Sequence, residues 1–192
     1  RRPCFERPAR AVAVQAALGL VETQSSGLGG GAFLLYYDAQ TGAITAFDGR
    51  ETAPAAATPG MFLDENGAPL SYQDAVTSGR STGVPGAVAM LGLVHSKHGR
   101  LPWQSLFDAP IRSAEQVFGV PQRLGRFANS KFAQATLPDA RALFSRADGT
   151  IVQAAPTNHS FGPMPARANA GASTSTIAGW VRTVGIARRR SC

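Results

Sequence analysis

The sequence predicts an α+β fold in which the β-sheet is incomplete. A helix-forming segment comes first, two strand-like segments around a glycine-containing turn follow it, and every later regular segment is predicted to be helical. This order favours helices layered on a sheet. Two strands are only marginally stable by themselves, and sheets in globular proteins usually have more. We therefore expect the sheet to need partner strands that this sequence does not supply.

The first helix is predicted over residues 11–22, where apolar residues occur almost all the way round a helical projection. This pattern is typical of a helix buried inside a larger body. A glycine-dense stretch follows at residues 27–31, and glycine lets a backbone pass close to another segment or a ligand. The stretch is not a dinucleotide fingerprint, because such a motif follows a strand and opens a helix. No Gly-Lys-Ser/Thr ends it, so it is not a phosphate loop either.

An antiparallel hairpin is the best-supported element. Residues 32–38 and 43–48 are short, rich in aromatic and branched side chains, and flank a turn that contains Gly42. The first strand is apolar on both faces, so we expect it to be central in its sheet and covered on both sides. Residues 49–60 contain two prolines and two glycines and are predicted to form an ordered loop.

Five further helical segments are predicted in the rest of the chain. They cover residues 71–79, 85–98, 102–118, 121–127 and 139–144. Asn66-Gly67 predicts a turn ahead of them. Ser71 is the expected N-cap of the first, with Asp74 three residues on as in a capping box. Pro110 is expected to kink the third segment or split it in two.

Positive charge is concentrated at the two ends of this 192-residue chain, whose formal net charge is +7. Residues 1–10 hold four arginines and one acidic residue, and residues 155–192 hold five arginines and no acidic residue. Residues 11–154 are near neutral, with 10 basic and 11 acidic side chains. Because terminal arginine clusters are usually solvated, we expect no nucleic-acid partner. A small basic binding protein that uses its ends stays an alternative.

Several other classes of protein lack support in the sequence. No apolar run reaches the roughly 18 residues of a membrane helix, and no signal peptide is visible. Cys4 and Cys192 lie near opposite ends and indicate neither a disulfide framework nor a zinc site. His95 and His98 share a predicted helix, but no acidic or cysteine partner lies nearby, so we interpret them as surface residues. We predict no metal.

Arg50 is the candidate binding residue. The sequence offers no set of nucleophile, base and orienting residue, so the candidates for chemistry are few. Arg50 follows a strand end and opens the loop of residues 51–54. A guanidinium held on such a loop can bind a carboxylate through two parallel hydrogen bonds. A surface ion pair of Arg50 with Glu51 or Asp48 is equally compatible with the residues alone.

Several motifs, taken together, resemble the signature blocks of γ-glutamyltransferases (glutathione hydrolases). They occur in the family's order and cover about residues 11–154. They are VETQSSGLGGGAF at residues 21–33, DGRETAP at 48–54 followed by Met61-Phe62, GVPG at 83–86, and HGRLPW at 98–103. The match rests on this series, since no single motif would be sufficient.

The resemblance implies an αββα sandwich of the N-terminal-nucleophile hydrolase type, of which this chain would form part. Such enzymes arise from one precursor that cuts itself into a large and a small subunit. The new N-terminal threonine of the small subunit attacks the γ-amide of glutathione, with its own amine as base. The γ-glutamyl group then passes to water, an amino acid or a peptide, and no cofactor takes part.

The same resemblance assigns roles within this chain. It implies that Arg50 holds the α-carboxylate of the substrate, that no catalytic residue lies in this chain, and that the small subunit is a missing partner. We therefore expect the chain alone to be inactive. Family members are often periplasmic or extracellular. The related cephalosporin (glutaryl) acylases share the fold and the carboxylate-binding arginine and are the alternative within the family.

The sequence departs from the family pattern at its ends. Residues 1–10 form an atypical basic end in place of the family's Gly-Gly-Asn-Ala-Val-Asp helix start. Residues 155–192 mix Pro, Gly, Ser, Thr, Asn and Ala with almost no apolar periodicity, and we expect this basic tail to be disordered. The predicted organisation is thus a family-like segment, residues 11–154, between two unrelated ends.

Overall fold

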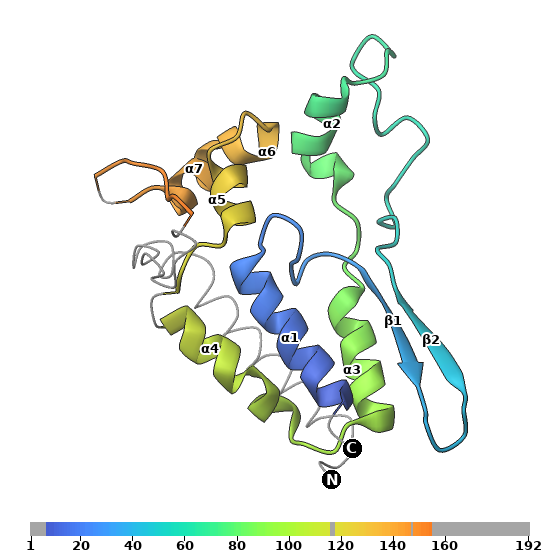
Figure 1. Ribbon diagram of the computed structural model, residues 1–192. Coiled ribbons are helices and arrows are strands. Elements are labelled where there is room, and N and C mark those ends of the chain that lie inside the picture. Colours follow the sequence, from blue (N-terminus) through green and yellow to red (C-terminus); the bar gives the residue numbers. More distant parts are fainter. Residues whose placement is uncertain (1–6, 116–117, 147, 155–192) are drawn as a thin grey trace. The chain divides into compact units, whose positions relative to one another are not determined.

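The computed structural model describes residues 7–115, 118–146 and 148–154 (Figure 1). These residues group into two compact units. One is Leu28–Val94, and the other combines the described residues of Arg1–Gly27 and His95–Cys192. The predictions for the basic tail at residues 155–192, for Cys4 and for Cys192 lie outside the described residues.

The unit Leu28–Val94 contains the predicted hairpin. Strand β1 (Ala32–Tyr37) pairs antiparallel with β2 (Ile44–Gly49), in a register that runs from Ala32↔Gly49 to Tyr37↔Ile44. The two strands are drawn as adjacent arrows in Figure 1. The turn closes through Asp38, whose backbone N–H donates to Ala43 O at 2.9 Å, while Gly42 takes a φ of +71°. The hairpin and its turn are therefore confirmed.

Within the described residues β1 is neither central nor covered, which differs from the expectation. Among the described residues β1 pairs with β2 alone, and its side chains alternate between half-buried and exposed. Phe33, Leu35 and Tyr37 are 68%, 74% and 55% exposed. Successive side chains of a strand point to opposite faces, so an uncovered ribbon turns every second side chain outward. Their partners across the register, Asp48, Ala46 and Ile44, are exposed as well.

The helix α2 (Tyr72–Thr77) confirms the predicted N-cap. The Ser71 hydroxyl oxygen accepts a hydrogen bond from the backbone N–H of Asp74 at 3.2 Å. The Asp74 carboxylate accepts from that same hydroxyl at 2.6 Å, instead of from the Ser71 backbone N–H. The reciprocal bond of a capping box is thus replaced by a contact between side chains. A short 3-10 helix, η2 (Gly79–Ser81), follows and was not predicted.

The helix α3 (Ala87–His98) begins directly after Pro85-Gly86, close to the predicted start. Within the unit Leu28–Val94 it buries Ala87, Met90, Leu91 and Val94. A Cβ built on Gly49 would lie 2.7 Å from the Met90 Cβ, so glycine at the end of β2 permits this close packing. The contact places α3 against the end of the hairpin from which Arg50 emerges.

In the other unit, α1 (Arg7–Val21) packs against the 3-10 helix η3 (Trp103–Phe107) and α4 (Asp108–Glu115). The predicted helix thus exists and begins at Arg7, four residues earlier than expected. Its buried side chains recur at helical spacing: Ala9, Val12, Ala16 and Leu20. Val14 is 55% exposed and Leu18 is 38% exposed, so the expected burial on all sides is wrong for this structure.

The predicted helix over residues 102–118 is split, as Pro110 indicated. The 3-10 segment η3 ends at Phe107 and α4 starts at Asp108, which places Pro110 in the first turn of α4. Proline is tolerated there, because the first backbone N–H groups of a helix have no intrahelical partner. Pro110 is itself buried. The division of the helix is therefore confirmed, with the break just before the proline.

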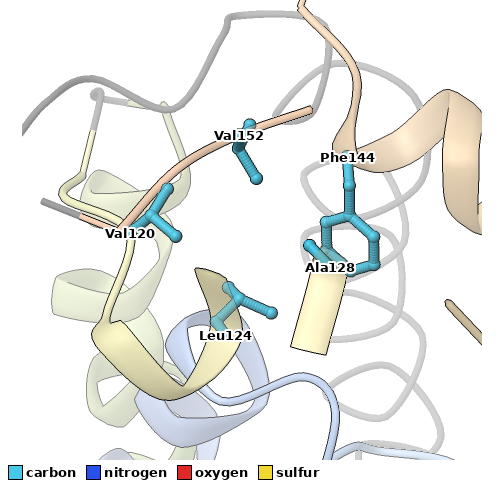
Figure 2. Close-up of a cluster of buried hydrophobic side chains, with 5 residues drawn as sticks. All are labelled: Val120, Leu124, Ala128, Phe144 and Val152. Carbon is cyan, nitrogen blue, oxygen red and sulfur yellow. The ribbon is translucent and has the colours of Figure 1, made fainter. Parts of the chain in front are cut away.

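A second hydrophobic cluster lies among the last described elements. Helices α5 (Gln122–Ala128) and α7 (Pro138–Phe144) confirm two predictions, whereas α6 (Ala133–Thr136) was missed. Figure 2 shows the buried side chains that these elements and two flanking segments bring together: Val120, Leu124, Ala128, Phe144 and Val152. A Cβ on Gly125 would lie 2.6 Å from Ala154 N, so this glycine admits the returning chain. No described helix has the length and apolar character needed to cross a bilayer.

Candidate functional site

Arg50 is the first residue after β2, and its backbone is fixed by the residue two positions earlier. The Asp48 carboxylate oxygen Oδ1 accepts the Arg50 backbone N–H at 2.8 Å, the local turn that Asp side chains favour. The side chain of Arg50 is 70% exposed, and its Nη1 lies 3.7 Å from Glu51 Oε2. An exposed pair at that separation contributes little free energy, so the guanidinium is accessible to another anion.

The Gly-Val-Pro-Gly stretch crosses the Arg50 segment. Val84 N–H donates to Thr52 O at 2.8 Å, and Thr52 N–H donates back to Val84 O at 3.3 Å. A Cβ on Gly86 would lie only 2.6 Å from Gly49 O and 2.7 Å from Arg50 O. Any side chain at Gly86 would therefore push the two backbones apart. The crossing defines the course of the chain on both sides of Arg50.

The glycine-dense stretch reaches the same place with its last two residues. A Cβ on Gly31 would meet the Glu51 carboxylate and would lie 2.9 Å from Glu51 N, and Ala87 N–H donates to Gly30 O at 3.1 Å. Gly27 and Gly29 have no such close neighbour in the part of the chain that the structure describes. Three motifs that are separate in the sequence therefore meet around Arg50 and Glu51.

An open pocket of about 360 Å³ lies beside Arg50. Two guanidiniums and one carboxylate are its charged groups, and threonine and serine hydroxyls are also present in its wall. It is lined by Arg50, Glu51, Thr52, Ala53, Pro54, Met61, Phe62, Arg80, Ser81, Thr82 and Gly83. A small pocket with an excess of guanidinium over carboxylate groups is suited to an anion such as a carboxylate.

Arg80 is the pocket residue that sequence reasoning missed. Its Nη1 donates to Met61 O at 3.2 Å and to Leu63 O at 3.0 Å. Arg80 stands 30 residues after Arg50 and carries no motif of its own. One feature of the sequence could have indicated Arg80: it lies three residues before the Gly-Val-Pro-Gly stretch, which contacts the Arg50 segment.

The two histidines are not part of this pocket, and the interpretation of both as surface residues is wrong for His95. His95 is 8% exposed, its Nε2 is 2.9 Å from Leu101 O, and its ring meets Trp103 edge-on at 5.1 Å. It is buried because Gly99 lets the chain turn back across its ring at the end of α3. Within the described ranges no three His, Cys, Asp or Glu residues are grouped as a metal site would require.

Solved structures share this fold over most of the chain. A γ-glutamyltranspeptidase from Helicobacter pylori superposes with a TM-score of 0.75 at 24% identity, covering 93% of this chain and 47% of the other. One from Pseudomonas nitroreducens, complexed with L-DON, gives a TM-score of 0.69 at 24% identity, covering 95% of this chain and 53% of the other. The predicted α+β class is thus confirmed, as a part of a larger known fold.

The chain belongs to the gamma-glutamyltranspeptidase family, whose model matches residues 10–159. The family resemblance inferred from the motifs is therefore confirmed. The match includes Arg50, the glycine-dense stretch and the Gly-Val-Pro-Gly crossing.

Curated relatives show the same relationship at higher identity. The glutathione hydrolase proenzyme of Bacillus subtilis (strain 168) is 44% identical over 110 residues, which are 57% of this chain and 19% of that protein. Glutathione hydrolase 3 of Arabidopsis thaliana is 38% identical over 148 residues, 77% of this chain and 22% of that protein. Glutathione hydrolase 5 proenzyme of Rattus norvegicus is 36% identical over 163 residues, which are 83% of this chain and 27% of that protein. The chain thus spans about a fifth to a quarter of these relatives.

Proposed function

We propose that the chain forms part of the large subunit of a γ-glutamyltransferase that cleaves the γ-glutamyl amide of glutathione. Family membership and the names of the relatives, which are glutathione hydrolases, support this proposal. Several of them are proenzymes, which supports a precursor that also supplies a small subunit. In this proposal the attacking threonine belongs to the small subunit, outside these 192 residues.

The observation that carries the proposal is the exposed Arg50 guanidinium on its fixed loop beside a pocket. Its backbone is held by Asp48 and by the crossing of Gly86, while its exposed side chain lies 3.7 Å from Glu51 within the described residues. We assign Arg50 to the α-carboxylate of the γ-glutamyl donor. A bidentate pair with that carboxylate would replace the longer contact with Glu51.

The contribution of this chain to the reaction is then positional. In the reaction the threonine hydroxyl attacks the γ-carbonyl and the threonine's own amine takes its proton. The amine passes this proton to the amide nitrogen as the γ-amide bond breaks, so the leaving group departs as a neutral amine and the threonine is left as an ester. The resulting ester transfers the γ-glutamyl group to water or to an acceptor amine. Three carbon atoms separate the α-carboxylate from the γ-carbonyl. Holding the carboxylate therefore restricts the position of the γ-carbonyl, which lowers the entropic cost of attack. The proposal needs neither a metal nor a cofactor.

The uncovered face of the hairpin supports a place in the proposed αββα sandwich. Phe33, Leu35, Tyr37 and Ile44 form this open hairpin face, and each of them is more than half exposed. Large apolar side chains gathered on one face of a sheet are typical of a surface that another layer covers. We assign the second layer of the sandwich to this face.

Binding of L-glutamate to the chain tests the role of Arg50. We expect a titration followed by ¹⁵N–¹H NMR to shift the Arg50 side-chain Nε–H signal and the backbone signals of Glu51 and Thr52. The variant Arg50→Gln should lose these shifts. The control Arg112→Gln removes the same charge from an exposed position on α4 and should bind as the wild type does. Unchanged binding by Arg50→Gln, or no binding by the wild type, would contradict the proposal.

A further inference from the structure

Arg80 connects two segments of the pocket wall that are far apart in sequence. It lies on η2 and lines the pocket together with Arg50. Its Nη1 donates to the carbonyls of Met61 and Leu63, which lie 19 and 17 residues away. Both bonds come from one nitrogen of a charged donor, and hydrogen bonds from charged groups are stronger than neutral ones.

The carbonyls of residues 61–63 bond to two different parts of the chain. This segment pairs with the chain after Gly67, where Leu70 N–H donates to Phe62 O at 2.8 Å. The segment is a turn, since Met61 N–H donates to Thr58 O at 3.1 Å and Leu63 N–H donates to Gly60 O at 3.0 Å. The Phe62 carbonyl thus accepts from Leu70, while the carbonyls of Met61 and Leu63 on either side of it accept from Arg80.

The Arg80 backbone is itself attached to the Arg50 segment. The Ser81 hydroxyl donates to Ser78 O at 3.1 Å, which fixes the 3-10 turn. Val84, four residues after Arg80, forms the paired backbone hydrogen bonds with Thr52 described above. A short, hydrogen-bonded path therefore runs from the Arg50 loop through η2 to the turn at Met61.

We propose that Arg80 is a positioning residue of the Arg50 pocket, because its hydrogen bonds hold the Met61–Phe62 wall at the place where a carboxylate ligand enters beside Arg50. This inference rests on the proposed role of Arg50. We assign Arg80 an action through the wall because its Nη1 is bonded to the carbonyls of Met61 and Leu63.

Substitutions at Arg80 separate positioning from charge. Arg80→Met removes every donor, whereas Arg80→Lys keeps one nitrogen that can donate to both carbonyls. In the L-glutamate titration we expect Arg80→Met to raise the dissociation constant about tenfold and Arg80→Lys to stay within about twofold. Amide hydrogen exchange at Leu70, whose N–H bonds Phe62 O, should become faster in Arg80→Met only. The control is again Arg112→Gln.

Measurements at raised ionic strength and with Arg50→Gln distinguish a failure of the Arg80 inference from a failure of the proposed function. The weaker binding of Arg80→Met should persist at about 0.5 M salt, where interactions between exposed charges are screened. A difference that vanishes in salt, or equal binding by Arg80→Met and wild type, would overturn the positioning role while leaving Arg50 in place. If Arg80→Lys, folded as judged by its unfolding curve, binds as weakly as Arg80→Met, the inference is also overturned. Loss of the Arg50 dependence itself would instead reject the proposed function.

Discussion

Arg50 is compatible with both hypotheses that the sequence raised for it, an ion pair with Glu51 and the proposed binding of a carboxylate. The ion-pair alternative is present as the 3.7 Å contact between the Arg50 side chain and Glu51. Asp48 instead accepts a hydrogen bond from the Arg50 backbone N–H. The contact is long and the guanidinium is mostly exposed, so a ligand carboxylate can compete for it. The loop position of Arg50 was predictable from the sequence, because a strand and a proline-containing segment flank it.

Asp148 gives a test of local electrostatics at the scale of single residues. The Thr150 hydroxyl donates to its Oδ1 at 2.7 Å and the Thr150 backbone N–H at 2.9 Å, and these bonds lower the pKa of Asp148 below its ordinary value of 3.8. Because the folded pKa is depressed, the stabilisation is present above the unfolded pKa and is lost as pH falls through the folded pKa.

We therefore expect Thr150→Val to raise the pKa of Asp148 toward 3.8, as measured by NMR titration of its carboxyl carbon. The acid limb of the unfolding free energy should become shallower in this variant. A matched control is Thr41→Val, in the turn of the other unit, which should leave Asp148 unchanged. An unaltered Asp148 titration in Thr150→Val would contradict the assigned cause.

At the scale of elements, the sequence was sufficient to predict those features that depend on residues close together in the chain. The hairpin around Gly42, the cap at Ser71 and the break near Pro110 each depend on neighbours in sequence, and each was predictable. The short segments η2 and α6 have only three and four residues, too few for a periodic pattern. Burial of His95 depends on Gly99 and Trp103 folding back over it, which no local pattern specifies.

Alanine substitutions at two glycines of the unit Leu28–Val94 should change the free energy of unfolding in opposite directions. A Cβ at Gly86 would overlap the carbonyls of Gly49 and Arg50, whereas a Cβ at Gly92 meets open space inside α3. We expect Gly86→Ala to lower the free energy of unfolding by about 1–3 kcal/mol, because neither backbone can yield easily. Gly92→Ala should raise it by about 0.5–1 kcal/mol through a better helix propensity.

Urea unfolding followed by circular dichroism measures both changes. Gly86→Ala should in addition weaken L-glutamate binding, since the crossing sets the course of the chain at Arg50. Equal stability of Gly86→Ala and wild type would show that the two segments can separate without cost. In that case the crossing would not fix the site.

At the scale of the whole molecule, the motifs identified the family although the sheet in the described residues has two strands. The position of Arg50 in its loop could be inferred from the sequence. The pocket could not, because its wall is assembled from three loops joined by Arg80 and Val84. The expected burial of both faces of β1 differs from the structure because such burial needs further layers, which the described residues do not include.

We predict that the chain alone does not hydrolyse a γ-glutamyl anilide, because the proposed nucleophile lies on the small subunit. Release of the coloured aniline, followed by absorbance, should stay at the rate of the buffer blank. Wild type and Arg50→Ala should be indistinguishable in this assay. Hydrolysis above the blank that disappears in Arg50→Ala would place the nucleophile within these residues and contradict the division of roles.

The open hairpin face has a consequence for the behaviour of the chain in concentrated solution. Among the described residues the sheet consists of these two strands, and the exposed side chains of Phe33, Leu35, Tyr37 and Ile44 lie on one side of it. Such ribbons can lengthen by edge-to-edge pairing and can stack through their apolar sides. The same surface that suits a second sheet layer therefore makes self-association, and ultimately precipitation, the competing fate when that layer is not there.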